Sequence, residues 1–300
     1  MSTVLVAVLG ATAALSVAAG PAQAASARST ATVADRLVLE PTDRGYRGSL
    51  TVDLTYRGTE PGRATYVITE PIPGSYENVE WGISCYSSGD VLPDYRTRVE
   101  CDVPGGELAP GERRSFTLDF RVLTSLQPHA MKAGNGRLAV KVGGEVVADE
   151  AFSTRFRSTT GTLADPQPYV QDTQPDVSVS ITGGLTLARR PDGFFEGRLP
   201  VTVRYNGDAP HDQVWFEPVS LPDGIWEPWT EECGLNCVPG GAFMEGEERT
   251  FTLIFSTASE LAAGDLGEGS IAFRALSRYP NDLNPADNVI TFPVTVTGAA

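Results

Sequence analysis

The chain has 300 residues, with 38 acidic against 23 basic side chains and a formal net charge of −15. So acidic a protein repels phosphate backbones and anionic lipid, which argues against nucleic acid and membrane surfaces as partners. Only two histidines and four cysteines are present, so a four-ligand metal site or a histidine-dependent triad has little to draw on. We therefore expect no catalytic residues, no cofactor and no resident metal.

Residues 1–24 have the composition of a secretory signal peptide. They are uncharged and mostly apolar, and they end in the small-residue pattern Ala22-Gln23-Ala24, which is typical of a cleavage site. The sequence thus predicts a mature chain that starts at Ala25, is secreted and has no stable membrane insertion. A signal peptide normally opens with a basic residue, whereas the first one here is Arg28. A misplaced start codon and an uncleaved anchor are the two alternatives.

Strict alternation of apolar and polar residues is the dominant pattern in the rest of the chain. It is typical of β-strands with one face in a core, and turn-forming Gly, Pro, Asn and Asp separate the runs. This spacing predicts Greek-key β-sandwiches. The clearest runs are 50–56, 116–122, 199–205, 251–255 and 290–296.

The same sequence pattern occurs twice, which indicates a tandem duplication. A Val-Pro-Gly-Gly turn followed by a Gly-Glu-x-Arg-x-Phe strand start occupies residues 103–116 and returns at 238–251. A second correspondence matches 46–56 to 195–205 with a different offset, so the copies differ in loop length. Repeated segments of this size predict two similar domains.

The domain boundaries follow from the repeat and from composition. We expect one β-sandwich over 33–158 and a second over 176–300. Between them, residues 159–175 are rich in Pro and Gln and poor in branched apolar side chains. Three prolines in this stretch favour an extended spacer over a flexible tether.

The four cysteines fall two in each copy: Cys85 and Cys101, then Cys233 and Cys237. In an exported protein they are expected to form disulfides. Three connectivities are formally possible, and independent domains favour Cys85–Cys101 with Cys233–Cys237. Metal binding by the last two thiolates is the alternative.

The end of the second copy has the pattern Asp282-x-Asn284-Pro285-x-x-Asn288 before its last strand. This resembles the closing hairpin of immunoglobulin-like repeats in bacterial surface and secreted proteins, of the conserved-repeat and cell-adhesion-related type. The resemblance implies two tandem immunoglobulin-like domains in a non-catalytic extracellular spacer, adhesin or binding module. The first copy departs from it, because its final turn at Gly143-Gly144 lacks the Asn-Pro sequence.

The same turn offers oxygen ligands at short spacing. Asp282, Asn284, Asp287 and Asn288 have the chemistry that calcium prefers, although their spacing does not match an EF-hand loop. Side chains that cap the turn explain the same residues without an ion. We expect capping, and calcium stays open at this point.

No nucleophile elbow, zinc-protease helix, P-loop or dinucleotide motif occurs in the sequence. Both histidines, His129 and His211, fall in predicted loops and are expected to be solvated. The acidic residues lie in turns and on the polar faces of strands, where we expect surface charge and not a catalytic carboxylate pair.

The most unusual stretch contains Trp226 and Trp229, separated by Glu227 and a proline and followed by Glu231 and Glu232. Two tryptophans at this spacing cannot both face one core along a regular strand, so one is expected to be exposed or to cap the end of the sandwich. They either form a ligand-binding surface, with Glu227 beside it, or close the sandwich end.

Two functions fit these features. The first is a monomeric, non-catalytic secreted spacer, adhesin or binding module with an extracellular protein, cell-wall or polysaccharide partner. The second is a carbohydrate-binding or carbohydrate-acting protein that uses the loop of Trp226 and Trp229.

Overall fold

The computed structural model describes residues 28–77, 85–257, 261–277 and 281–298. Within these ranges the regular structure is entirely β, as the alternating sequence pattern predicts. The signal peptide predicted for residues 1–24 lies outside the described residues. Among the described residues, no helix has the length and apolar composition needed to cross a membrane.

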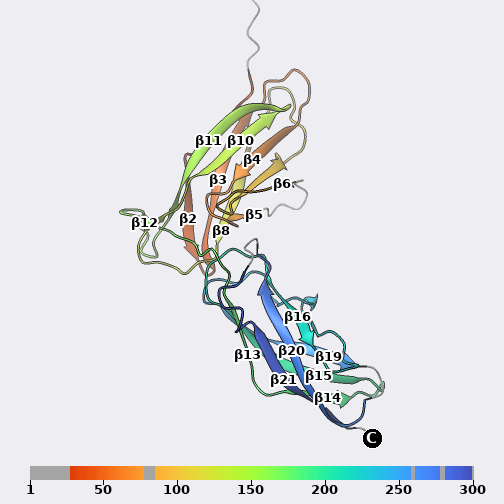
Figure 1. Cartoon of the computed structure of the whole chain (residues 1–300). Coiled ribbons are helices and arrows are strands. Elements are labelled where there is room, and N and C mark those ends of the chain that lie inside the picture. The colour runs from red at the N-terminus through yellow and green to blue at the C-terminus, as the bar shows by residue number, and fades with distance from the viewer. Residues whose placement is uncertain (1–27, 78–84, 258–260, 278–280, 299–300) are drawn as a thin grey trace, which may run out of the picture.

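Two separate sheets stand at opposite ends of an elongated molecule (Figure 1). The first contains β1 (Thr30–Val33), β2 (Arg36–Thr42), β3 (Gly45–Thr55), β4 (Ala64–Thr69), β5 (Tyr76–Glu77), β6 (Cys85–Val91), β7 (Thr97–Asp102), β8 (Arg113–Val122), β9 (Met131–Lys132), β10 (Gly136–Val142), β11 (Glu145–Phe156) and β12 (Gln167–Pro168). The second contains β13 (Val177–Ile181), β14 (Leu185–Arg189), β15 (Phe195–Tyr205), β16 (Val214–Ser220), β17 (Trp229–Thr230), β18 (Gly234–Leu235), β19 (Glu248–Thr257), β20 (Gly264–Ala275) and β21 (Val289–Thr297).

The two sheets share their central pairings. In the first, the strand order is β5-β8-β3-β2-β11-β10-β4-β7-β6, and in the second it is β16-β20-β21-β14-β15-β19-β17-β18. Each has a parallel contact at the corresponding place, β2 with β11 and β14 with β21, and the first sheet has a second one where β12 pairs with β9. The other pairings are antiparallel. The repeated segments also pair in matching register, Leu50 with Leu118 and Leu199 with Leu253. The sequence duplication is therefore a structural one.

Each sheet curls around its own hydrophobic core. The first core is built from residues between Leu37 and Phe156, and the second from residues between Val177 and Val296. Burying a large apolar side chain contributes about 1.5–3 kcal/mol, so each core contains enough of them to hold its sheet. The most deeply buried large side chains are Tyr46, Tyr66, Phe120, Phe152 and Phe156 in the first core, and Phe195, Tyr205, Phe216, Phe243, Phe255, Phe273 and Phe292 in the second.

An arginine side chain holds the repeated turn in its conformation. In the first copy, Nη1 of Arg114 donates to the carbonyl oxygens of Pro104 and Gly106, both at 2.8 Å. Glu112 orients the guanidinium through an ion pair of 2.6 Å. Glycine is required in the turn because Gly105 and Gly106 have φ of 90° and 74°, a region that side chains disfavour.

The second copy repeats this arrangement at Arg249. Its Nη1 donates to the carbonyl oxygens of Pro239 and Gly241, again both at 2.8 Å. Glu247 takes the place of Glu112, with an ion pair of 2.7 Å. The guanidinium also lies over the ring of Phe243, 3.8 Å from its centroid.

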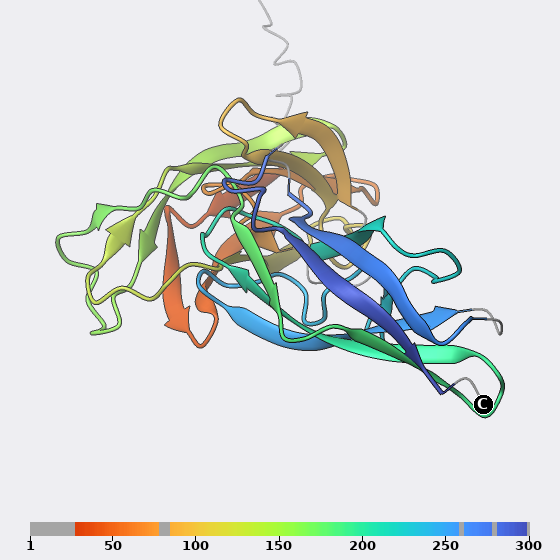
Figure 2. The same ribbon diagram turned by 60° about the horizontal axis from the view of Figure 1, so that its bottom comes forward.

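The segment between the two cores follows the surface of the first sheet. Its strand β12 pairs with β9, and the ring of Tyr169 lies 4.7 Å from that of Phe156. The turned view in Figure 2 again places the C-terminus at the end remote from the first sheet. Part of the segment predicted as a spacer is thus hydrogen-bonded to the first domain, and turns and bends interrupt it at 159–161, 164–165 and 173–174.

Candidate functional site

Both predicted tryptophans lie on the outer face of the second sheet, away from its core. The N–H of Trp226 donates to the carbonyl oxygen of Ser256 at 2.9 Å, and Trp229 pairs with Ile254. On β19, Leu253 and Phe255 face the core, so the side chains between and beside them point outward. Both aromatic rings therefore lie on the outer surface of the second sheet, near the end that is remote from the first domain.

The two tryptophans have different environments. Trp226 is 51% exposed and contacts Phe194, itself 41% exposed, with ring centroids 6.0 Å apart and planes at 52°. Trp229 is half-buried beside Ile254, which is only 1% exposed although it points away from the core. Trp226 thus presents a free ring face, while Trp229 covers the sheet.

Charged side chains border these rings. Arg198 forms an ion pair of 2.8 Å with Glu231 and a second of 3.5 Å with Glu196. Glu227 is exposed beside Trp226. We call the set Phe194, Arg198, Trp226, Trp229 and Glu231 the Trp226 surface. It combines apolar ring faces with hydrogen-bonding groups, which suits a ligand that has both kinds of surface.

Both predicted disulfides are present. Cys85–Cys101 links β6 to β7, and Cys233–Cys237 joins the turn of the β17–β18 hairpin to the chain just after β18. Short closed loops lose little conformational freedom on binding, so the second disulfide restrains the hairpin that begins at Trp229. No free cysteine occurs among the described residues.

Sequence reasoning missed Trp215, which lies behind this hairpin. Trp215 forms a bridge to Cys237, and its Nε1 is buried with no hydrogen-bond partner in the described structure. The neighbouring Oδ1 of Asn236 is buried and unpartnered in the same way. The sequence did contain a signal for it. Trp215 lies on β16 between two core residues, Val214 and Phe216, so the alternation of a strand places the Trp215 side chain on the outer face.

The acidic turn before β21 has the capping hydrogen bonds that the sequence predicts. Asp282 accepts from the N–H groups of Val177 and Asn284, both at 3.0 Å, and Asn284 donates to Asp287 at 2.8 Å. Asp176, which sequence reasoning missed, brings a third carboxylate within 4.8 Å of those of Asp282 and Asp287. Burial, and then the neighbouring carboxylates, raise the pKa of Asp176. These three carboxylates are the ones that could ligate a cation, although capping already accounts for Asp282.

The second copy of the turn motif forms the contact between the domains. Arg44 of the first domain donates to the carbonyl oxygen of Ala242 at 2.8 Å and pairs with Glu247 at 2.9 Å. Glu245 accepts from the hydroxyl of Thr124 at 2.9 Å and from the N–H of Ser125 at 2.7 Å. Charge-assisted bonds of this kind fix orientation as well as adding attraction.

Asp208 fastens the linker at the same junction. Its carboxylate accepts from the hydroxyl of Tyr169 at 2.6 Å and from the N–H of Asp172 at 2.8 Å. Burial raises the pKa of both Tyr169 and Asp208, and their mutual contact adds to the effect on Tyr169. Ion pairs and linker bonds together make the junction a specific interface.

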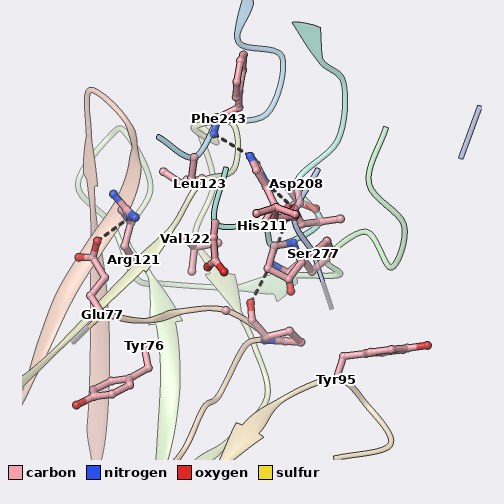
Figure 3. A pocket seen from close by; sticks show the side chains of 18 residues that line it. Tyr76, Glu77, Tyr95, Arg121, Val122, Leu123, Asp208, His211, Phe243 and Ser277 are labelled. Carbon is pink, nitrogen blue, oxygen red and sulfur yellow. Dashed lines mark hydrogen bonds and ion pairs between the residues drawn. The ribbon is translucent and has the colours of Figure 1, made fainter. Parts of the chain in front are cut away.

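A cavity of ≈ 510 Å³ opens at this junction, lined by both domains and by the linker (Figure 3). His211 projects into it, and the structure contradicts the expectation that this histidine is solvated. Its Nε2 accepts from the N–H of Phe243 at 2.8 Å, its Nδ1 lies 3.3 Å from the carbonyl oxygen of Ala209, and its ring stacks 4.1 Å from that of Tyr205. Burial lowers the pKa of His211 to about 4, so the ring is neutral at pH 7.

No known protein family matches the sequence, and no curated protein does. Among solved structures, the chain is similar to a protein of unknown function from Porphyromonas gingivalis W83, with 13% identity and a TM-score of 0.23 over 89% of this chain and 99% of that one. It is also similar to a transglutaminase from red sea bream, with 11% identity and a TM-score of 0.23 over 87% of this chain and 31% of that one. Similarity at this level carries no argument about function.

Proposed function

We propose that this protein is a secreted, non-catalytic binding module of two immunoglobulin-like Greek-key domains, and that its Trp226 surface binds polysaccharide. The single observation that carries the proposal is the half-exposed ring of Trp226 packed against the exposed ring of Phe194. Aromatic side chains are enriched where a protein surface meets a partner, and exposed apolar patches mark interaction sites.

The geometry favours a sugar over a purely apolar partner. A pyranose has one apolar face that can stack on an indole ring and hydroxyl groups around its edge that need hydrogen-bond partners. Arg198 and Glu231 offer donors and acceptors on the same face of the sheet, in the row of Ile254 and Trp229, already oriented by their 2.8 Å ion pair. Such pre-organisation lowers the entropic cost of binding.

The position of the surface also suits a binding module. Trp226 lies near the end of β19 that is remote from the first domain, because β19 begins at the domain junction and ends beside Trp226. The junction contacts of Arg44 and Glu245 hold the two domains together at the other end. The Trp226 surface is therefore not covered by the first domain.

Secretion forms part of the proposal. Two disulfides are compatible with an oxidising compartment, and the acidic composition favours solubility there. The predicted signal peptide leads to the same compartment.

The test is co-sedimentation of the purified mature protein with insoluble polysaccharides of different linkage, with Trp226→Ala as the variant. We expect binding to weaken at least about tenfold, equivalent to about 1.4 kcal/mol, while the free energy of unfolding changes by less than about 1 kcal/mol. Leu283→Ala is the matched control, because Leu283 is 62% exposed in the same domain but lies in the turn beside the linker.

Unchanged binding by the Trp226→Ala protein would contradict the proposal, as would a loss of several kcal/mol of stability, which would identify the ring as a packing element. Release of soluble sugar from bound polysaccharide would instead indicate a carbohydrate-acting protein, with Glu227 as the first residue to examine.

A further inference from the structure

The cavity between the domains is independent of the Trp226 surface. It lies at the junction end of the second domain, where His211 and Phe243 meet Arg121 of the first domain. Its volume of ≈ 510 Å³ is in the range of small-molecule sites. The walls come from two domains whose relative position is fixed by hydrogen bonds and ion pairs, so the cavity is a built feature of the junction.

Its charged groups leave an excess of negative charge. Glu77 and Arg121 neutralise each other through an ion pair of 2.8 Å. Asp208 accepts hydrogen bonds from neutral donors, among them the hydroxyl of Tyr169 and the N–H of Asp172. The Asp212 carboxylate is exposed at the cavity and takes part in none of the ion pairs or side-chain hydrogen bonds of the described structure.

Among the described residues, basic groups outside the wall do not cancel this excess. Arg44 is engaged by Glu247. Arg47, 3.6 Å from Glu77, shares that carboxylate with Arg121, and its single charge is outnumbered by Asp208 and Asp212; neither arginine belongs to the cavity wall. His211 contributes no positive charge at pH 7, because its Nε2 accepts a hydrogen bond and its pKa is lowered. An anionic ligand would therefore be repelled and a cationic one attracted.

Apolar groups complete the lining. Pro73 and Pro210 stand on opposite domains, and Phe243 and Leu276 add apolar wall on the second. Such walls accommodate the methylene stem of an amphipathic side chain while its charged head reaches polar groups.

We propose that the interdomain cavity binds a primary ammonium or guanidinium group on a short apolar stem, as a lysine or arginine side chain presents it. The cation pairs with the Asp212 carboxylate, and the stem lies against Pro73 and Pro210. The same chemistry is found in a free alkylamine and in a basic residue of a peptide, and the experiment separates these two sources.

The experiment is an NMR titration of the full mature chain, which follows the backbone amides of Gly74 and His211. The probes are Nα-acetyl-lysine methylamide, its neutral counterpart Nα-acetyl-norleucine methylamide, butylamine, and a blocked Gly-Lys-Gly peptide. We expect saturable shifts with the lysine derivative and none with the norleucine derivative. Tighter binding of the peptide than of butylamine assigns the site to peptides, and the reverse order assigns it to small amines.

Asp212→Asn should weaken binding of the lysine derivative about tenfold, because it removes the charge but keeps the shape. Glu268→Gln is the matched control, since Glu268 is an exposed acid of the same domain on β20, outside the cavity. Trp226→Ala should leave amine binding unchanged, which separates this site from the polysaccharide proposal. Equal binding of the lysine and norleucine derivatives, or full binding by the Asp212→Asn protein, would overturn the inference.

Discussion

Lowering the pH should reduce the stability of this protein, because folding disfavours protonation of His211. The Nε2 atom of this ring accepts a hydrogen bond from the N–H of Phe243, so the ring proton sits on Nδ1, facing the carbonyl oxygen of Ala209. Protonation of Nε2 breaks the bond to Phe243 and places a charge in a buried site near Arg249. Burial is the main reason that the pKa of His211 falls from 6.5 to about 4.

The sign and the size of the change in unfolding free energy follow from the linkage between protonation and folding. The folded state binds the proton more weakly than the unfolded chain, so the contribution to stability is complete above pH 6.5 and is lost as the pH falls towards 4. At 1.36 kcal/mol for each pKa unit, the change from 6.5 to about 4 corresponds to at most about 3 kcal/mol. That is a large share of the stability of an ordinary domain.

Urea unfolding between pH 7 and pH 4 tests this, with the wild type compared with His211→Gln. A glutamine keeps an acceptor for the N–H of Phe243 but does not titrate, so the wild type should lose up to about 3 kcal/mol relative to the variant over this range. Asp208 and Glu247 also titrate near His211, and Arg121 and Arg249 stay charged, but these groups are common to both proteins.

His129→Gln, which removes the only other histidine, is the control. An NMR titration of the ring proton on Cε1 gives the pKa of His211 directly. Parallel pH profiles for the wild type and His211→Gln, or an NMR midpoint near 6.5, would refute the reasoning.

Two further predictions concern the loops. Replacing Cys85 and Cys101 by Ala should lower the unfolding free energy by about 3 kcal/mol, and replacing Cys233 and Cys237 should lower it by about 2 kcal/mol. The difference arises because the closed loops span sequence separations of 16 and 4. Calorimetry that ranks the two losses in the opposite order would contradict the loop-entropy argument. Asp282→Ala should cost about 1–3 kcal/mol in urea unfolding, because two backbone N–H groups lose their acceptor; a negligible loss would remove the capping interpretation.

The strands and the duplication were predictable from the sequence because they depend on local periodicity. Alternation at 50–56 and 199–205 determines which side chains enter the core, and the matched motifs pair in matching register. The all-β architecture and both disulfides were therefore predicted. Sequence reasoning also predicted that one of Trp226 and Trp229 is exposed or caps the sandwich end, although only the structure shows that Trp226 is the exposed one.

The junction was not predictable for a physical reason. His211 follows a proline in a polar turn, a context typical of solvated loops, and only the docking of the first domain and the Phe243 loop buries it. In the same way, Asp176 joins the acidic turn through tertiary contact and not through sequence spacing. Sites built from several distant loops leave no periodic pattern in a single sequence.

The junction between the domains uses the second copy of the duplicated turn. In the first copy, Glu112 serves only its own turn, accepting from the N–H of Ala109 and pairing with Arg114. In the second copy, Glu247 makes the equivalent bonds to Met244 and Arg249 and has an oxygen within 2.9 Å of Arg44 in the other domain. Bonds within the turn hold it in both copies, so docking costs little additional conformational entropy. A motif that stabilises one domain thereby becomes, in its second copy, the surface that orients two.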